Sequence, residues 1–192
     1  MKTITNMLAA AATFFSLLLP LAHSHAQAQS FELSSTDIGN GGAIAQSFAF
    51  NDFGCTGQNL SPALNWRDAP KGTQSLAVMV HDADAVTGGA GFWHWAVINL
   101  PAGASGLIRG AGSLESKALP VGARQIATDF GTPAWGGPCP PAGDKPHRYT
   151  FTVYALKVDK LDLPSNATAS LAGFMVNANS LGKASFTATY GR

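Results

Sequence analysis

Apolar residues in this chain occur in short runs, and glycine and proline separate one run from the next. The 192 residues include 21 Gly and 11 Pro, which are spread along the chain. Short apolar runs bounded by turn residues are typical of strands joined by turns and argue against a helix bundle. We therefore predict a mostly β fold. The strand candidates are residues 44–50, 75–81, 95–100, 149–156 and 184–190.

One segment has a helical period instead. Its apolar residues recur at spacings of three and four, after Ser165 and Asn166, which can cap a helix. These apolar positions are Leu171, Phe174, Met175 and Ala178. We predict a helix over residues 167–178. Residues 103–124 and 129–146 show neither period and are rich in Gly and Pro, so we expect long loops there, of the kind that often carry function.

The N-terminal residues are typical of an export signal. Lys2 precedes a charge-free apolar stretch over residues 7–22, and an Ala-Gln-Ala sequence ends at residue 28. We predict a signal peptide over residues 1–28 and a single domain over 29–192, located in the periplasm or outside the cell. The alternative is a membrane anchor, but the stretch falls short of the roughly 20 apolar residues that a spanning helix needs.

The charge of the chain is nearly balanced. It has 12 Lys and Arg against 11 Asp and Glu, and Lys2 lies in the predicted signal. A neutral surface argues against partners that are bound through bulk charge, such as nucleic acid or an acidic membrane. We therefore expect no nucleic-acid partner.

Cys55 and Cys139 are the only cysteines. In an exported protein such a pair is more often a disulfide than two free thiols, so we predict that they are joined. The alternative is a metal site, but neither cysteine has a second Cys or His at zinc-type spacing.

Two carboxylates follow the predicted strand 75–81. Asp82 and Asp84 are separated by Ala83, and this two-residue spacing can put both side chains on one side. They are candidates for a binding site. An equally weighted interpretation is that each caps a turn by accepting a hydrogen bond from a nearby backbone N–H.

Two histidines stand at the starts of strands. His94 lies among large aromatic residues before residues 95–100, and His147 ends a Gly/Pro-rich loop that begins at Gly136. A histidine such as His94 is more often structural than functional. Glycines in the loop allow close backbone approach and prolines restrict its conformations, so its N–H groups could point at an anion.

No nucleophile motif accompanies these residues. The chain lacks Gly-x-Ser-x-Gly, a Walker loop, His-Glu-x-x-His and Cys-x-x-Cys. We therefore expect a protein that is not an enzyme and that needs no cofactor and no metal. A mononuclear metal hydrolase using two His and two Asp is the lowest-ranked alternative.

Three separated motifs carry a family resemblance. They are Asp82-Ala83-Asp84-Ala85, then Trp93-His94-Trp95, then Gly-Pro-Cys-Pro-Pro-x-Gly-Asp-x-Pro followed by His147-Arg148-Tyr149. Taken in this order they resemble the phosphatidylethanolamine-binding protein family, most closely its bacterial Raf-kinase-inhibitor-like (YbhB/YbcL) branch. In that family the first motif often reads Asp-Pro-Asp-Ala-Pro, so Ala83 and Val86 replace two prolines here and we expect a less rigid corner.

The resemblance implies a β-sandwich of largely antiparallel sheets, with long loops, one or two short peripheral helices, and a pocket for phosphate-type anions such as the phosphatidylethanolamine head group. The ligand-binding residues that it implies are Asp82, Asp84, His94, Gly137, Pro141, His147 and Tyr149.

The function that we predict is non-catalytic binding of a small anion, either a phosphate ester or a carboxylate. Protonated His94 or His147 would donate charge-assisted hydrogen bonds, so binding should strengthen as the pH falls through roughly 6.5. The alternative is a protein-interaction module, such as a protease inhibitor or a kinase-inhibitor-like regulator, and a homodimer whose second subunit covers the pocket is a further expectation.

Overall fold

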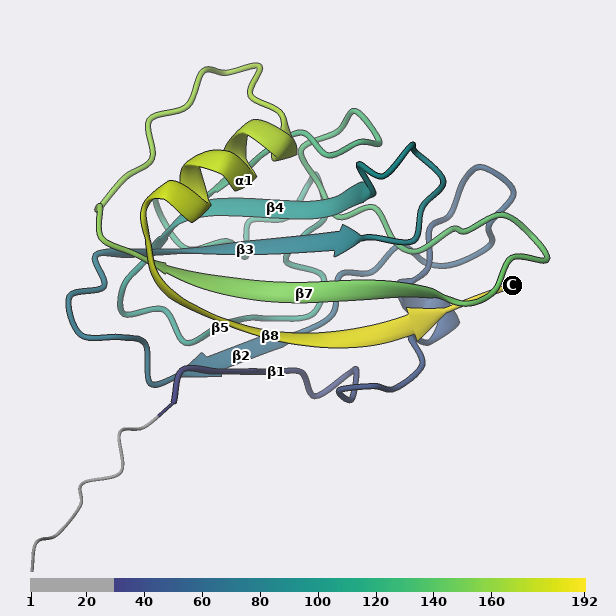
Figure 1. Cartoon of the computed structure of the whole chain (residues 1–192), viewed down its shortest axis with the longest axis horizontal. Helices are drawn as coiled ribbons and strands as arrows, with labels where there is room; N and C mark the ends of the chain where they lie inside the picture. Colours follow the sequence, from purple (N-terminus) through teal and green to yellow (C-terminus); the bar gives the residue numbers. More distant parts are fainter. Residues whose placement is uncertain (1–29) are drawn as a thin grey trace, which may run out of the picture.

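The computed structural model describes residues 30–192, so the predicted signal peptide over residues 1–28 lies outside the described range. The described part consists of two antiparallel sheets and one α-helix, α1 (Ala169–Ala178) (Figure 1). This arrangement confirms the predicted mostly β, sandwich-like fold with one peripheral helix. Within residues 30–192, no helix has both the length and the apolar character needed to cross a bilayer.

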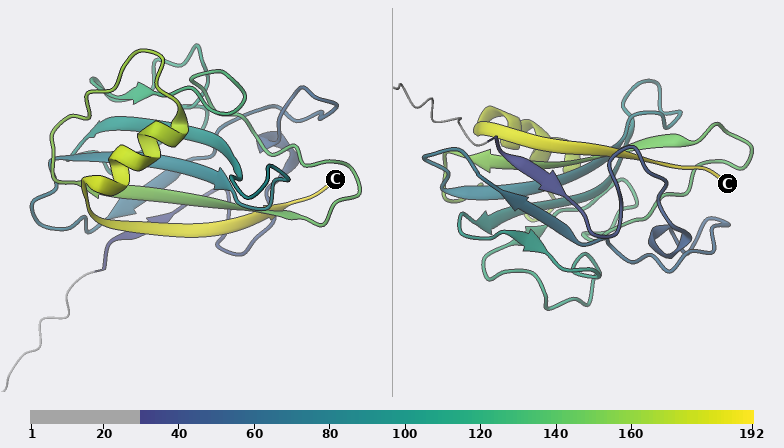
Figure 2. Two further views of the ribbon diagram at one scale, coloured as in Figure 1. Left: turned by 45° about the horizontal axis from the view of Figure 1, so that its top comes forward. Right: turned by 90° about the horizontal axis from the view of Figure 1, so that it is seen from below.

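The larger sheet has five strands, and each strand is antiparallel to its neighbours. In spatial order these are β6 (Arg124–Gln125), β4 (Phe92–Pro101), β3 (Ser75–Asp82), β7 (His147–Leu156) and β8 (Ser180–Tyr190). The smaller sheet comprises β1 (Glu32–Ser34), β2 (Leu64–Arg67) and β5 (Gly106–Leu107). Figure 2 shows the smaller sheet on one side of the larger sheet and α1 on the other.

Strand alternation explains why both faces of the larger sheet are covered. On β3, Leu76, Val78 and Val80 belong to the core between the two sheets, whereas Ala77 and Met79 belong to the core under α1. Successive side chains of a strand point to opposite faces, so a continuous apolar run fills two cores at once. The run of apolar residues in β3 therefore marks a strand that is buried on both faces.

The structure corrects one predicted strand. Residues 44–50 form no strand, and a 3₁₀ helix, Gln46–Phe48, lies within them. The segment is apolar because Ile44, Phe48 and Ala49 are buried, while its own turn bonds, Phe48 N to Ala45 O and Ala49 N to Gln46 O, bend the backbone. An apolar run signals burial and does not by itself distinguish a strand from a buried turn.

The other predicted elements are confirmed with shifted ends. β3, β4, β7 and β8 cover the remaining four candidates, and α1 begins at Ala169 because the Thr168 hydroxyl caps it by accepting the backbone N–H of Leu171 at 3.2 Å. The short strands β1, β2, β5 and β6 were not predicted. They contain two to four residues each, which is too short for a periodic pattern to register.

Antiparallel pairing places three ends of the central strands together. β3 ends at Asp82, β4 begins at Phe92 and β7 begins at His147, and these three termini lie at the same edge of the sheet, on the right in Figure 1. The long loop over residues 129–146 runs past this edge, and the C-terminal end of β8 lies beside it. The fold thus gathers the polar residues of three separate motifs at one edge.

Candidate functional site

A cavity of about 250 Å³ opens at this edge of the larger sheet. Its polar lining residues are Asp82, His94, His147 and Tyr149. Its other lining residues are Phe53, Ala85, Val86, Phe92, Phe130, Cys139, Pro140 and Pro141. One part of the wall therefore carries hydrogen-bonding groups, whereas most of it is aromatic or aliphatic.

Strand register places Asp82 at the centre of the polar part. Asp82 pairs with Phe92 on β4 and with Tyr149 on β7. His147 and Tyr149 are two residues apart on β7, so their side chains lie on one face of the sheet. The backbone ladder itself thus brings Asp82 of β3 beside Tyr149 and His147 of β7.

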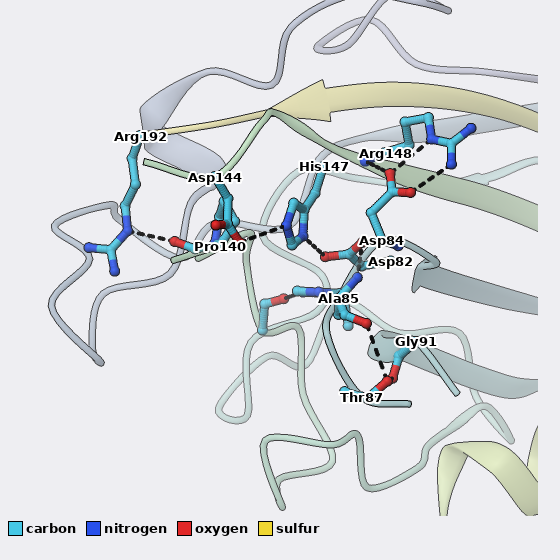
Figure 3. Close-up of polar contacts among 12 residues, drawn as sticks. Asp82, Asp84, Ala85, Thr87, Gly91, Pro140, Asp144, His147, Arg148 and Arg192 are labelled. Atoms are coloured by element: carbon cyan, nitrogen blue, oxygen red, sulfur yellow. Dashed lines mark hydrogen bonds and ion pairs between the residues drawn. The ribbon is translucent and has the colours of Figure 1, made fainter. Parts of the chain in front are cut away.

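Asp82 is buried, and its two carboxylate oxygens bind the turn that follows β3 and His147 of β7. One carboxylate oxygen, Oδ1, accepts the backbone N–H groups of Asp84 at 2.8 Å and Ala85 at 3.2 Å, and the other, Oδ2, lies 2.7 Å from Nδ1 of His147 (Figure 3). Asp82 therefore caps the turn that follows β3, as one interpretation of the sequence predicted, and it also contacts His147. Because a carboxylate only accepts, Nδ1 of His147 carries the hydrogen in this contact.

A second carboxylate approaches His147 from the other side. Oδ2 of Asp144 lies 3.5 Å from Nε2 of His147, and the Asp144 side chain is 39% exposed (Figure 3). A separation of 3.5 Å is at the long limit of a hydrogen bond, so Nε2 of His147 is only weakly engaged. Both ring nitrogens of His147 thus face a carboxylate oxygen.

His94 is buried and is held differently. Its Nδ1 lies 2.6 Å from the carbonyl oxygen of Gly136, and aromatic rings surround it, with the centroids of Phe130 and Tyr149 at 5.4 and 5.0 Å. Burial lowers the pKa of His94 to about 4, against the smaller opposing effect of the Gly136 carbonyl. The expectation that protonated His94 donates to an anion is therefore wrong near neutral pH, because this histidine is neutral there.

The hydroxyl of Tyr149 is buried and, among the described residues, it is the one buried side-chain polar atom without a hydrogen-bond partner. Burial first, and then the charge of Asp82 and its closeness to the phenol as an acceptor, raise the pKa of Tyr149, so the hydroxyl stays protonated. A buried hydroxyl without a partner costs about 1–3 kcal/mol. Tyr149, a lining residue of the cavity, therefore carries a hydroxyl that lies near Asp82 but makes no hydrogen bond of normal geometry.

The apolar part of the wall is built from aromatic rings and the disulfide. Phe130 stacks on Phe50 at a centroid distance of 4.3 Å and meets Phe92 edge-on at 4.9 Å. The predicted bond between Cys55 and Cys139 is present, and Cys139 itself lines the cavity. The disulfide ties the segment before residue 59 to the Gly/Pro-rich loop, which holds the wall in place.

Two of the seven predicted ligand-binding residues do not line this cavity. Asp84 faces Arg148, whose Nε and Nη2 bind its two oxygens at 2.8 and 2.6 Å, and this arginine lowers the pKa of Asp84 to about 2 (Figure 3). Gly137 packs in the layer behind the wall, where a Cβ would come within 2.1 Å of the carbonyl oxygen of Phe48. Asp84 is thus committed to an exposed ion pair, and Gly137 permits close backbone packing.

The remaining five, Asp82, His94, Pro141, His147 and Tyr149, line it together. The expected anion contacts from N–H groups of the Gly/Pro-rich loop are not available at its glycines. Gly136 N donates to the carbonyl of His94 at 2.9 Å, and Gly137 N donates to Oδ1 of Asn59 at 2.8 Å. The prolines of the loop have no N–H to offer.

Sequence reasoning missed the aromatic part of the cavity and Asp144. Phe53, Phe92 and Phe130 lie in or next to loops, where no periodic pattern exists to indicate a shared wall. Asp144 precedes His147 by three residues in one loop, and that spacing could have identified it. Within residues 30–192 no group of three or more His, Cys, Asp or Glu side chains is arranged to hold a metal ion.

Comparison with known families gives one match that spans most of the chain. The sequence model described as "Phosphatidylethanolamine-binding protein" matches residues 34–191. Among curated proteins, the chain is 47% identical to the UPF0098 protein YbcL of Escherichia coli over 165 residues, which cover 86% of this chain and 90% of YbcL. It is 43% identical to the UPF0098 protein YbhB of the same organism, covering 83% of this chain and 99% of YbhB.

Solved structures agree with the sequence comparison. The crystal structure of E. coli YbcL, described as a new member of the mammalian PEBP family, superposes with a TM-score of 0.82 at 46% identity and covers 84% of this chain and 98% of that chain. The CT736 protein of Chlamydia trachomatis superposes with a TM-score of 0.70 at 28% identity, covering 85% and 98% respectively.

Proposed function

The chain belongs to the phosphatidylethanolamine-binding protein family, and we propose that its cavity binds a small phosphate ester, such as the free head group phosphoethanolamine, without covalent chemistry. The observation that carries this proposal is the free hydroxyl of Tyr149, a buried donor in the wall of a cavity that also contains His147. A ligand oxygen at this point would give the hydroxyl the partner that it lacks.

His147 supplies the second polar contact. Its Nδ1 is oriented by Asp82, and its Nε2 is only weakly engaged by Asp144, so a ligand oxygen can take over Nε2. As an imidazolium, His147 would donate a charge-assisted hydrogen bond to a phosphate oxygen. Asp82 is fully used by its own contacts and acts as the residue that positions His147.

The lining supports a binding role over a covalent one. It contains no Ser, Thr or Lys, Cys139 is oxidised in the disulfide, and the raised pKa of Tyr149 disfavours the phenolate. Its aromatic rings suit the apolar part of an ester. Export is part of the proposal, since a disulfide is typical of proteins that fold in an oxidising compartment.

Calorimetric titration with phosphoethanolamine at pH 6 tests the proposal. The wild type should bind, Tyr149→Phe should weaken binding by about 5–10-fold, and His147→Ala should weaken it by about 10–100-fold. Tyr154→Phe is the matched control, since Tyr154 lies on the same strand but packs in the core under α1. No measurable binding by the folded wild type would overturn the proposal.

A second candidate function is docking of a protein partner at the mouth of the cavity. Phe53 and Val86, from two separate loops, line the cavity and yet are 69% and 89% exposed. Exposed apolar side chains beside a pocket are frequent in interaction sites. Inhibition assays against a panel of serine proteases test it: loss of inhibition in Phe53→Ser with Val86→Ser would support docking, and no inhibition by the wild type would remove the protease-inhibitor version.

A further inference from the structure

The hydrogen-bond direction of His94 is fixed by its surroundings. A carbonyl oxygen can only accept, so the 2.6 Å contact with Gly136 places the ring hydrogen on Nδ1. Because burial keeps the ring neutral near pH 7, Nε2 carries a lone pair. Nδ1 faces the backbone of the loop, and Nε2 is on the far side of the ring, toward the cavity that His94 lines.

The ring has little freedom to reverse this direction. Gly136 N donates back to the carbonyl of His94, so strand and loop are tied by two hydrogen bonds at this residue. The rings of Phe92, Phe130 and Tyr149 pack around the imidazole at centroid distances of 5.4, 5.4 and 5.0 Å. A ring flip would break the Gly136 contact and leave a buried carbonyl unpaired.

The charges around His94 do not favour a doubly charged ligand. Asp82 of β3 and His147 and Tyr149 of β7 line the cavity together with His94, and the charge of His81 on β3 also acts on the ring. The loop residues add Asp129, which binds the backbone N–H of Trp93, and Asp144, which contacts His147. None of these is a fixed cation.

Permanent cations near the site lie outside the cavity. The lining includes no Lys or Arg, and Lys145 and Arg148 border a separate groove on the other side of His147, where Arg148 is already paired with Asp84. Sites that hold phosphate dianions commonly use arginine or lysine clamps. A phosphate dianion in the cavity would lie beside the buried carboxylate of Asp82. Among the lining residues, only His147 could then supply a positive charge to balance it.

From these observations, and resting on the proposed function, we infer that the cavity selects the monoprotonated form of a phosphate monoester or phosphonate, whose P–O–H group donates to Nε2 of His94 while Tyr149 donates to another phosphoryl oxygen. His94 is thus a specificity-determining acceptor. The ligand must bring its own proton, because the histidine does not supply one.

The wild type can test this inference with ligands of different acidity. Phenyl phosphate has a second pKa of about 6, and phenylphosphonate has a higher one. If only the monoprotonated form binds, the apparent affinity should fall about tenfold for each pH unit above the second pKa of the ligand. The midpoint of this fall should therefore move upward from phenyl phosphate to phenylphosphonate, as measured by calorimetry between pH 5 and pH 8.5.

Two comparisons sharpen the test. Methyl phenyl phosphate, a monoanion without a P–O–H group, should bind at least tenfold more weakly than phenyl phosphate at pH 5. His94→Gln, whose side-chain amide can present a donor, should lose the preference for the protonated ligand, whereas His81→Gln should retain it. His81 is a matched control because its ring packs at a tilt against Trp93 and its Nε2 lies 3.1 Å from the carbonyl of Ala90.

The outcomes distinguish this inference from the proposed function. A midpoint that is the same for both phenyl ligands would show that a protein group titrates and would overturn the inference while leaving phosphate binding intact. Equal binding of the methyl diester at pH 5 would overturn it as well. Failure of all three ligands and of phosphoethanolamine at every pH would overturn the proposed function itself. If His94→Gln does not fold, the ligand series on the wild type still decides the matter.

Discussion

Two parts of the cavity wall each contain a buried histidine but differ in chemistry. We call them the wall of His94, which includes Phe92 and Phe130, and the wall of His147, which includes Asp82. His147 begins β7 and His94 is the third residue of β4, and both are buried and held through Nδ1. His94 binds a backbone carbonyl among aromatic rings, whereas His147 lies between the carboxylates of Asp82 and Asp144 (Figure 3). The partner of Nδ1, and what surrounds the ring, therefore decides what the other nitrogen can offer a ligand.

The difference shows that burial alone does not define a binding histidine. In the wall of His94, burial lowers the pKa and leaves a neutral acceptor. Around His147, the carboxylates of Asp82 and Asp144 lie beside the two ring nitrogens, and Asp82 keeps the hydrogen on Nδ1. A ligand that carries both a donor and an acceptor, such as a monoprotonated phosphate, complements the two walls together.

The largest expected loss of stability comes from removing the disulfide between Cys55 and Cys139, which lies at the apolar part of the cavity wall. Cys55→Ser combined with Cys139→Ser should lower the free energy of unfolding by about 4–5 kcal/mol, because the bond closes a loop between residues 84 positions apart. Urea unfolding followed by tryptophan fluorescence measures the change. Reduced wild type serves as the control and should match the variant, and an unchanged unfolding midpoint in both would contradict the prediction.

Removing the carboxylate that supports the wall of His147 should cost nearly as much. Asp82→Ala leaves the Nδ1–H of His147 and two backbone N–H groups without their acceptor, and breaking such a buried pair costs about 3–5 kcal/mol. Asp144→Ala is the matched control on the same ring, and it should cost less than about 1 kcal/mol because its contact is long and half-exposed. Similar losses in both variants would show that the two carboxylates are equivalent.

Acid should weaken the fold through His94. In the unfolded chain its pKa is near 6.5, whereas burial lowers it to about 4 in the folded protein. The unfolded state therefore binds more protons between these pH values, and the stability that is present above pH 6.5 is lost as the pH falls to 4, by up to about 3 kcal/mol.

Urea unfolding between pH 7 and pH 4 checks the acid effect. His94→Gln has no titrating group at this position, so its stability should decline less steeply with falling pH than that of the wild type. Parallel declines would assign the acid effect to other groups. Asp84 contributes only at lower pH, because its own pKa is lowered to about 2 and its effect begins below its unfolded value near 4.

The sequence predicted the strands that carry the site better than the contacts within it. Continuous apolar runs identified β3 and β7, and strict alternation identified β8, because burial on one or two faces leaves a direct pattern. Residues 44–50 had the same composition but are buried as a turn. The sequence predicted that these residues are buried. Their backbone conformation, however, depends on hydrogen bonds to β8 and to the Gly/Pro-rich loop.

Within the site, the residue types predicted which side chains are polar, but they did not predict which partner each side chain binds. Asp82 and Asp84 look alike in sequence, yet one orients His147 and the other binds Arg148. The protonation state of His94 depends on the packing of Phe92 and Phe130 around it, which comes from another strand position and a distant loop. Such differences arise from tertiary packing and leave no local pattern.

The smallest expected effect tests the placement of Asp84 outside the cavity. Asp84 and Arg148 form an exposed ion pair on the far side of the turn that follows β3, and such pairs contribute less than about 1 kcal/mol. Asp84→Ala, Arg148→Ala and the double variant should show a coupling energy in this range in a double-mutant cycle of urea unfolding. Their affinities for phosphoethanolamine should stay within about twofold of the wild type, because neither side chain lines the cavity. A loss of binding in Asp84→Ala comparable to that in His147→Ala would contradict this placement. It would show that the binding site includes the ion pair of Asp84 and Arg148 as well as Asp82 and His147.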